Sequence, residues 1–322
     1  MWEIAKICNF EAPFPLRKSE KPKHMTATEH KRSALVCWIE AMRLRTLPVS
    51  VSGVVTALAY ALMGDSFNMA TAILCLMFAV LAQIASNFAN EYYDYEAGLD
   101  APGREGPRRG VTEGDITPRA MLMATFATLG LACLTGLSLI YWGGWWLLAA
   151  GATIAFGVLA YSTGPYPLSH HALGELAVIA FFGIIPVNLT FYLQTGVWDT
   201  TVFFGSLSIG LMGANVLLVN NYRDIEADRL VGKRTLAVRV GRPAVSFLYL
   251  VNGWAAIVLV SPVWTVIGGG AWIVPVTYAT VHTLLWFAMS SRRGAALNPL
   301  LGATAMLMLF YSLGFLIAVS LM

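Results

Sequence analysis

Residues 90–100, NEYYDYEAGLD, concentrate side chains that could bind a metal ion. Four carboxylates fall within these eleven residues, and the run just before them, residues 69–89, carries no charge. Oxygen ligands suit Mg²⁺, which is usually held by one or two carboxylates together with the phosphates of a substrate. The tract is therefore a candidate metal and phosphate site at the end of an apolar segment.

The same pattern recurs later in the chain. Residues 90–97 read NEYYDYEA and residues 220–227 read NNYRDIEA, so both fit N-x-Y-x-D-x-E-A and both follow an uncharged apolar run. A single acidic tract could be a solvated loop. Two copies favour a functional site, because clustered ionisable groups at a membrane boundary are usually functional.

Spacing predicts how the side chains of the second copy are arranged. Asn220, Asp224 and Asp228 are four residues apart, so they stack on one face of a helix. The second copy is therefore expected to present an amide and two carboxylates together.

The first copy differs in its last acid. Asn90 and Asp94 stack in the same way, but Gly98 interrupts the pattern and the next acid is Asp100. A glycine can turn the chain sharply, so we expect Asp100 to return toward the same point.

Basic residues accompany both copies. Carboxylates alone would repel a diphosphate, so a bridging Mg²⁺ and nearby cations are both expected. The flanking basic residues are Arg104, Arg108, Arg109, Arg223, Arg229, Lys233 and Arg234. Interleaved acids and bases of this kind suit the stabilisation of a diphosphate leaving group.

Other polar residues nearby are predicted to have plainer roles. Glu96 and Glu226 lie two residues beyond the stacked aspartates, so we expect them to be solvated or salt-bridged. The side chains of His170 and His171 diverge because the residues are adjacent, which favours a loop role over metal binding. Glu175 opens an apolar run and is interpreted as a charge at a helix N-terminus.

The elements that position these residues are predicted to cross a membrane. The chain is 57% hydrophobic and only 12% charged, whereas soluble domains are about 25% charged. Its apolar residues fall into runs of about 18 to 23, long enough to cross a bilayer as helices. The fold class is therefore an all-α polytopic membrane bundle of about nine transmembrane helices. The predicted spans are 46–63, 69–89, 120–140, 145–161, 173–193, 201–221, 244–261, 272–290 and 299–321.

Basic residues also predict the orientation. With a cytoplasmic N-terminus, all 21 Lys and Arg lie in inside segments and none lies in an outer loop. The opposite orientation would violate the positive-inside rule throughout. The C-terminus is then outside, and both copies of the motif face the cytoplasm. The location expected is the bacterial cytoplasmic (inner) membrane.

The N-terminal part is predicted to be separate. Residues 1–37 are polar and lack the apolar core of a signal peptide, so we expect a disordered cytoplasmic extension. Residues 38–48, WIEAMRLRTLP, are typical of an interfacial helix that leads into the first span. The membrane domain is therefore assigned to residues 38–322.

The two motifs resemble the signature regions of a known family. NFANEYYDYEAGLD with the following GPRRGVTEGDITP, and NNYRDIEADRLVGKRTLAVRVG, are similar to those of the UbiA superfamily of intramembrane prenyltransferases. The resemblance covers about residues 38–322. Within the superfamily, the motifs more specifically resemble those of the 1,4-dihydroxy-2-naphthoate polyprenyltransferases of menaquinone biosynthesis. Two departures stand out: Glu91 occupies a position where many members have Asp, and Asp94 and Asp100 are six apart. The wider spacing resembles the naphthoate branch rather than the 4-hydroxybenzoate branch.

The resemblance implies Mg²⁺-dependent transfer of a polyprenyl group from its diphosphate to 1,4-dihydroxy-2-naphthoate, with decarboxylation, to give demethylmenaquinone. By position, it implies that Mg²⁺-diphosphate would be held by Asn90, Asp94, Asp100, Asp224 and Asp228. The catalytic residues it implies are Asp94, Asp224, Asp228 and Lys233. The substrate-binding residues it implies are Asn90, Arg109, Arg104, Arg43, Tyr161 and Asn221.

Two alternatives remain open at this point. A prenyltransferase of the same family could act on 4-hydroxybenzoate or homogentisate. A cation or solute transporter is an alternative from another class, but transporter sites lie near the bilayer midplane, whereas these acids gather at one membrane face. Membrane lipid is an expected partner, and nucleic acid is not.

Overall fold

The computed structural model describes residues 32–100 and 105–322, and residues 33–322 form one compact unit. Every regular element in these described ranges is helical, which confirms the all-α prediction. The predicted polar extension lies mostly outside the described residues, as does Arg104. The α-helices are α1 Ala34–Met42, α2 Leu47–Met63, α3 Met69–Glu96, α4 Pro118–Gly143, α5 Leu147–Ala160, α6 Gly174–Val178, α7 Ile185–Thr195, α8 Thr200–Leu230, α9 Leu236–Ile267, α10 Ile273–Ser291 and α11 Asn298–Ser320.

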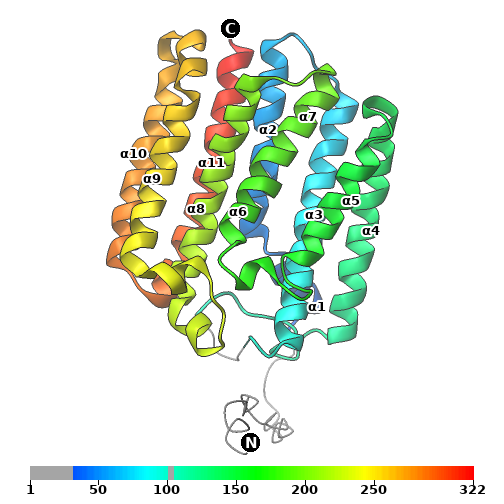
Figure 1. Ribbon diagram of the computed structural model, residues 1–322, viewed down its shortest axis with the longest axis vertical. Helices are drawn as coiled ribbons and strands as arrows, with labels where there is room; N and C mark the ends of the chain where they lie inside the picture. Colours follow the sequence, from blue (N-terminus) through cyan, green and yellow to red (C-terminus); the bar gives the residue numbers. More distant parts are fainter. Residues whose placement is uncertain (1–31, 101–104) are drawn as a thin grey trace, which may run out of the picture. The chain divides into compact units, whose positions relative to one another are not determined.

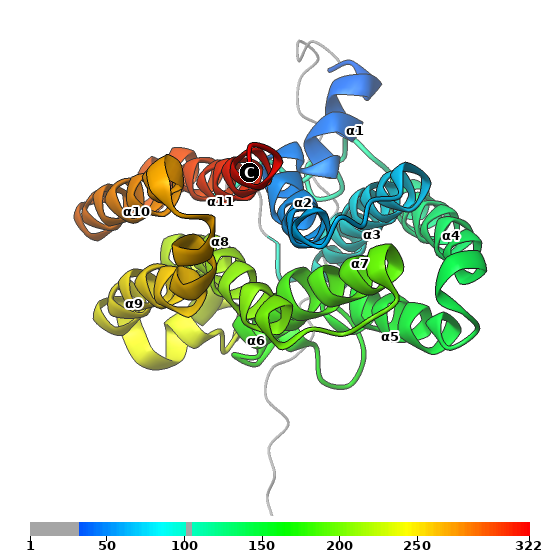
Figure 2. The same cartoon turned by 90° about the horizontal axis from the view of Figure 1, so that it is seen from above.

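The helices of this unit stand in two rows (Figures 1 and 2). One row contains α10, α11, α2, α3 and α4, and the other contains α9, α8, the α6–α7 segment and α5. The segment Ala34–Met63, which ends in α2, and helix α8 are the most buried of the long helical segments, since 72% of the most apolar stretch of each is buried. Helix α8, which carries the second motif, therefore lies deep in the bundle.

Within residues 32–100 and 105–322, eight helical segments are long and apolar enough to cross a membrane. The remaining predicted span, residues 145–161, is longer than the helix that the structure has there. Helix α5 has only 14 residues, which gives a length of about 21 Å against the roughly 30 Å of a hydrocarbon core. The reason is that Gly144 has a left-handed φ of 85°, so the two apolar tryptophans after it precede the helix rather than extend it.

Helices α3 and α8 continue beyond their apolar runs and carry both motifs. Each helix has a side-chain cap at its start: Asn68 accepts from the Thr71 amide, and Asp199 accepts from the amides of Thr201 and Val202. Both helices end at the lower end of the bundle in Figure 1, opposite the C-terminus. The two motifs therefore emerge together, as predicted. The assignment of that end to the cytoplasm stays a prediction.

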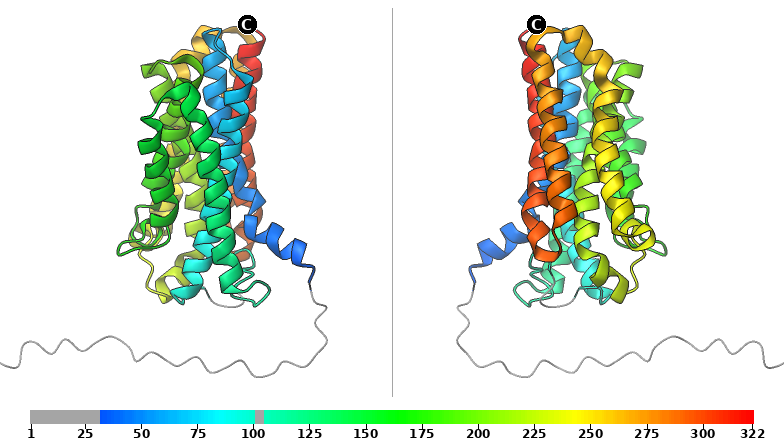
Figure 3. Two further views of the ribbon diagram at one scale, coloured as in Figure 1. Left: turned by 90° about the vertical axis from the view of Figure 1, so that its right-hand side faces the viewer. Right: turned by 90° about the vertical axis from the view of Figure 1, so that its left-hand side faces the viewer.

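Two further features place elements beside the motifs. Helix α1 projects from the bundle at an angle to α2 (Figure 3), because Arg43 between them has a left-handed φ of 52°. The π-helical segment Ile179–Ile184 joins α6 to α7 and packs backbone to backbone on α8. A Cβ at Gly183 would lie 2.5 Å from the Gly210 Cα, so only glycine allows this approach.

Candidate active site

The first motif folds back on itself as the sequence predicted. Asn90 and Asp94 lie on consecutive turns of α3, and the Asn90 amide donates to the Asp94 carboxylate at 3.3 Å. Gly98 then adopts a left-handed φ of 67° and turns the chain. Arg109 bridges the result, because its guanidinium lies 3.4 Å from Asp94 and 3.2 Å from Asp100. The two aspartates thus share one cation despite their wider spacing.

Asp94 is the centre of this network and is only 1% exposed. Besides Arg109, its carboxylate contacts the Lys233 ammonium at 3.1 Å and the His170 Nε2 at 3.4 Å. These partners come from the α8–α9 loop and from the short helix Leu168–His170. The Arg234 amide also donates to the His170 carbonyl at 2.9 Å. Three segments distant in sequence therefore meet around one carboxylate.

The second motif carries its own internal ion pair. Arg223 donates to both carboxylate oxygens of Asp224, each at 2.7 Å, and both side chains are buried. The same guanidinium also donates to Asn220 and to Asn298 at the start of α11, both at 2.8 Å. Bidentate charge-assisted pairs fix geometry as well as adding energy. Arg223 thus fixes Asp224 on α8 and links it to the start of α11.

Asp228 lies one turn beyond Asp224 and begins the turn that presents Lys233. Gly232 has a left-handed φ of 79°, and the Lys233 amide donates to the Asp228 carbonyl at 2.9 Å. The Thr235 hydroxyl, which caps α9, donates to the Asp228 carboxylate at 3.4 Å. This turn directs Lys233 from the second motif toward Asp94 of the first.

A buried glutamate anchors the loop that carries Arg109. Glu91 is 1% exposed, and its Oε1 accepts from the Val111 amide at 3.1 Å. In the same loop, the Nε of Arg108 donates to Asp115 at 2.8 Å. This hydrogen bond, helped by the negative charges of Asp115 and Glu113, raises the pKa of Arg108 above its already high usual value. Arg108 is therefore a permanent cation at the rim of the site.

The two motifs line one polar cavity of about 540 Å³. Arg43 also lines it and donates to the side-chain Oδ1 of Asn90 at 2.9 Å, and Tyr161 and Asn221 form part of its wall. The predicted residues that the structure gathers around this cavity are Arg43, Asn90, Asp94, Arg109, Tyr161, Asn221, Asp224, Asp228 and Lys233. Asp100 joins them through Arg109.

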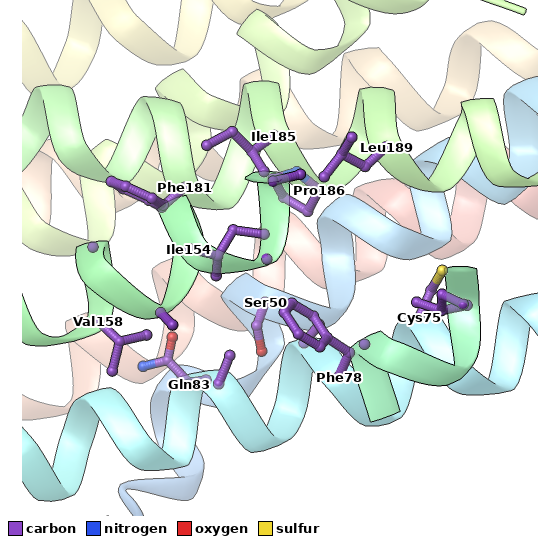
Figure 4. Close-up of a pocket in the computed structure, with 18 of the residues that line it drawn as sticks. Ser50, Cys75, Phe78, Gln83, Ile154, Val158, Phe181, Ile185, Pro186 and Leu189 are labelled. Carbon is purple, nitrogen blue, oxygen red and sulfur yellow. The ribbon is translucent and has the colours of Figure 1, made fainter. Parts of the chain in front are cut away.

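An apolar groove of about 280 Å³ continues from the cavity. Figure 4 shows side chains of α3, α5 and α7 facing one another across it, among them Phe78, Ile154 and Leu189. The cavity and the groove share five lining residues: Gln83, Ser86, Tyr161, Val178 and Phe182. The site thus joins a charged end to a hydrocarbon-lined end.

The donor set fits a hard divalent cation by its chemistry. Carboxylate and amide oxygens from both motifs line the same cavity, which is the ligand type that Mg²⁺ takes. Within the described residues, no group of three or more His, Cys, Asp or Glu is already clustered as a metal site. Basic side chains lie against Asp94, Asp100 and Asp224 instead. A bound metal would therefore replace or share these cation contacts.

Comparison with known proteins agrees with this geometry. The model of the UbiA prenyltransferase family matches residues 50–318. The chain is 33% identical to a 1,4-dihydroxy-2-naphthoate octaprenyltransferase of Haemophilus influenzae, over 88% of this chain and 96% of that one. It is 36% identical to the Escherichia coli protein of the same name, over 66% and 71% of the two chains.

The chain belongs to the UbiA prenyltransferase family.

Solved structures show the same fold for this UbiA family member. A UbiA homologue from Archaeoglobus fulgidus, bound to GPP and Mg²⁺, superposes with a TM-score of 0.63 at 14% identity, covering 87% of this chain and 99% of that one. The apo structure of a homologue from Aeropyrum pernix gives a TM-score of 0.64 at 18% identity, covering 85% and 98%. With its apolar helices, this family member is an integral membrane protein.

Sequence reasoning missed some contacts of this UbiA site. His170, interpreted as a loop residue, reaches Asp94, and Glu175, interpreted as a helix-end charge, also accepts a hydrogen bond from Asn221 at 2.9 Å. Neither contact has a local sequence signal, because the partners are 76 and 46 residues apart. The prediction for Glu226 is confirmed, since its exposed carboxylate pairs with Arg229 and Arg242. Glu96 is exposed, also as predicted.

Proposed function

We propose that the protein transfers a polyprenyl group from polyprenyl diphosphate to 1,4-dihydroxy-2-naphthoate, with loss of CO₂, as in menaquinone biosynthesis. The observation that carries this proposal is the continuous site, in which a charged cavity opens into an apolar groove. Such a site matches a substrate with a diphosphate head and a hydrocarbon tail. Relatives named as 1,4-dihydroxy-2-naphthoate octaprenyltransferases support the choice of acceptor.

The metal in this proposal is Mg²⁺, which would neutralise charge on the departing diphosphate. The residues proposed to hold it are Asn90, Asp94, Asp100, Asp224 and Asp228. Support comes from their oxygen chemistry and from their convergence from two helix ends. The structure of the Archaeoglobus homologue with GPP and Mg²⁺ provides a precedent within the same fold.

Basic residues of the chain would bind the diphosphate itself. Lys233 and Arg109 both contact Asp94 and both line the cavity, so their cations are placed where phosphate oxygens would lie. Arg43 adds a third cation, and its guanidinium donates to the same Asn90 Oδ1 as Arg109 does. As the allylic C–O bond breaks, its electron pair leaves with the diphosphate, and fixed cations stabilise that developing charge. Arg104 also stays in the proposal as a phosphate-binding residue from sequence.

The groove would hold the prenyl tail and exclude water from the reacting carbon. Its walls are almost wholly apolar, with Phe181 and Phe182 near the junction with the cavity. Because water would otherwise capture an allylic cation, a dry junction protects the intermediate. The electron-rich naphthol ring then attacks, and CO₂ leaves from the same ring carbon, so that its bonding electrons restore the aromatic ring.

The proposed setting is the bacterial cytoplasmic membrane, with the site facing the cytoplasm. This choice rests on the basic residues, which all lie in predicted inside segments. Diphosphate substrates are water-soluble at the head, so a site at the membrane face gives the head access from the aqueous phase.

The test is direct competition between acceptors. Purified protein is incubated with Mg²⁺, a polyprenyl diphosphate, and equal concentrations of 1,4-dihydroxy-2-naphthoate, 4-hydroxybenzoate and homogentisate. Mass analysis should find a prenylated naphthol that lacks its carboxyl group, with little prenylated benzoate. Preference for another acceptor would defeat the menaquinone assignment but keep the prenyltransferase reaction. No transfer to any acceptor would defeat both.

A further inference from the structure

Glu175 is a buried carboxylate to which the proposed reaction gives no role. It lies in the first turn of α6, is 7% exposed, and accepts a hydrogen bond from the Asn221 amide at 2.9 Å. Its second oxygen, Oε2, has no hydrogen-bond partner among the described residues. Burying a carboxylate is costly, so its retention beside the cavity requires an explanation.

The carboxylate determines how Asn221 faces the cavity. The Asn221 NH₂ group donates to Glu175 Oε1, so the nitrogen end of the amide is turned toward Glu175. The other end of the amide, Oδ1, is then left as an acceptor. Asn221 is itself part of the cavity wall. The pair therefore offers a fixed hydrogen-bond acceptor to whatever occupies that part of the cavity.

The position of Asn221 along α8 separates it from the charged residues. Asp224 and Asp228 lie further toward the end of the helix, whereas Leu217 and Gly213, four and eight residues before Asn221, continue its stripe into the bundle. Asn221 is thus at the boundary between the charged end and an apolar wall. The apolar side chains of Val49, Val178 and Met308 pack around Gly213, so this wall is apolar.

The acceptor atom of Asn221 determines which kind of ligand group can bind at this boundary. The oxygens of an ionised diphosphate accept hydrogen bonds, so they gain nothing from another acceptor. A phenolic hydroxyl donates, and its ring would lie against the apolar stripe. We infer that Asn221 Oδ1 accepts a hydrogen bond from a hydroxyl of the aromatic acceptor, and that Glu175 is the positioning residue that orients the Asn221 amide. This inference rests on the proposed function and identifies its acceptor subsite.

The test compares ligands that differ by one hydroxyl. Dissociation constants are measured without polyprenyl diphosphate for 1,4-dihydroxy-2-naphthoate and for its two analogues, 1-hydroxy-2-naphthoate and 4-hydroxy-2-naphthoate. In the wild type, loss of the hydroxyl that contacts Asn221 should weaken binding about tenfold, the usual scale of one hydrogen bond. In Asn221→Leu, the dihydroxy ligand should weaken by the same factor and no longer be distinguished from that analogue.

Variants of Glu175 distinguish a positioning role of this residue from a purely structural one. Glu175→Leu removes the partner of the amide and should raise the acceptor KM about tenfold while leaving the polyprenyl diphosphate KM unchanged. Glu175→Gln keeps a carbonyl oxygen for the Asn221 NH₂ group, so it should recover most of the loss. Glu226→Gln, at an exposed carboxylate, is the matched control and should change neither KM.

Several outcomes would overturn the inference. One is full discrimination between hydroxyl analogues in Asn221→Leu, and another is a rise in the polyprenyl diphosphate KM in place of the acceptor KM. A fall in kcat with both KM values intact in Glu175→Leu would show a structural role only. The dissociation constants can be measured without turnover. A wild type that binds the naphthoate analogues with different affinities but transfers no prenyl group would therefore defeat the proposed function, while the proposed acceptor subsite would stand.

Discussion

Replacement of Glu91 by alanine should release the loop that carries Arg109. The Glu91 carboxylate is 1% exposed and accepts from the Val111 amide at 3.1 Å, two residues after Arg109. Val111 also packs in an apolar cluster with Phe88 of α3. Without Glu91, this apolar packing remains, but the Val111 amide loses its acceptor in a buried position.

The size of the effect follows from that hydrogen bond. A hydrogen bond to a charged group contributes about 1.5–3 kcal/mol, which corresponds to about 10- to 150-fold in the equilibrium constant between the docked and the undocked loop. Because Arg109 contacts both Asp94 and Asp100, an undocked loop removes a phosphate-binding cation. We therefore expect the kcat/KM for polyprenyl diphosphate to fall at least about tenfold, with the acceptor KM nearly unchanged.

Two measurements check this prediction. Steady-state kinetics are recorded for Glu91→Ala and for Glu91→Gln, which keeps an oxygen for the Val111 amide and should be much milder. Limited trypsin digestion should cut after Arg108 or Arg109 faster in Glu91→Ala than in the wild type. Unchanged kinetics and unchanged cleavage in Glu91→Ala would refute the reasoning. Equal damage from Gln and Ala would show that the charge matters and the hydrogen bond does not.

Two further predictions concern the carboxylates and the metal. Asp94→Asn and Asp224→Asn should each lower turnover at least about 100-fold, because each removes a ligand charge. Glu226→Gln should have only a mild effect on turnover. Equal losses of turnover in all three variants, measured on folded protein, would instead implicate general surface charge. Chelation by EDTA should abolish product formation and added Mg²⁺ should restore it, so full activity in chelator would contradict the metal assignment.

The sequence could predict the fold class and the convergence of the two motifs, because both depend on local patterns. Apolar runs of membrane-spanning length predicted the helices, and the four-residue spacing of Asn220 and Asp224 predicted their shared face. The turn at Gly98 was predictable for the same reason, since glycine alone adopts its left-handed conformation easily. The length of α5 was overestimated, because apolar composition continues through the turn at Gly144 where the helix does not.

Contacts between distant segments could not be predicted in this way. The approach of His170 to Asp94 depends on how the 168–170 segment packs against the α8–α9 loop. The pairing of Glu175 with Asn221 depends on the backbone contact between the π-helical segment and α8 at Gly183 and Gly210. Such contacts leave no periodic signal in the chain, because the register between two helices is set by their side-chain volumes together.

The charges of the site explain why a divalent cation is expected even though basic residues already surround the carboxylates. Asp94 and Asp100 share Arg109, Asp94 also contacts Lys233, and Asp224 pairs with Arg223. These cations are already shared with the carboxylates, so a diphosphate entering the cavity would bring more negative charge than they balance. Buried uncompensated charge is strongly unfavourable. Additional positive charge must therefore enter with the substrate, and oxygen ligands from two helix ends favour Mg²⁺ as its source.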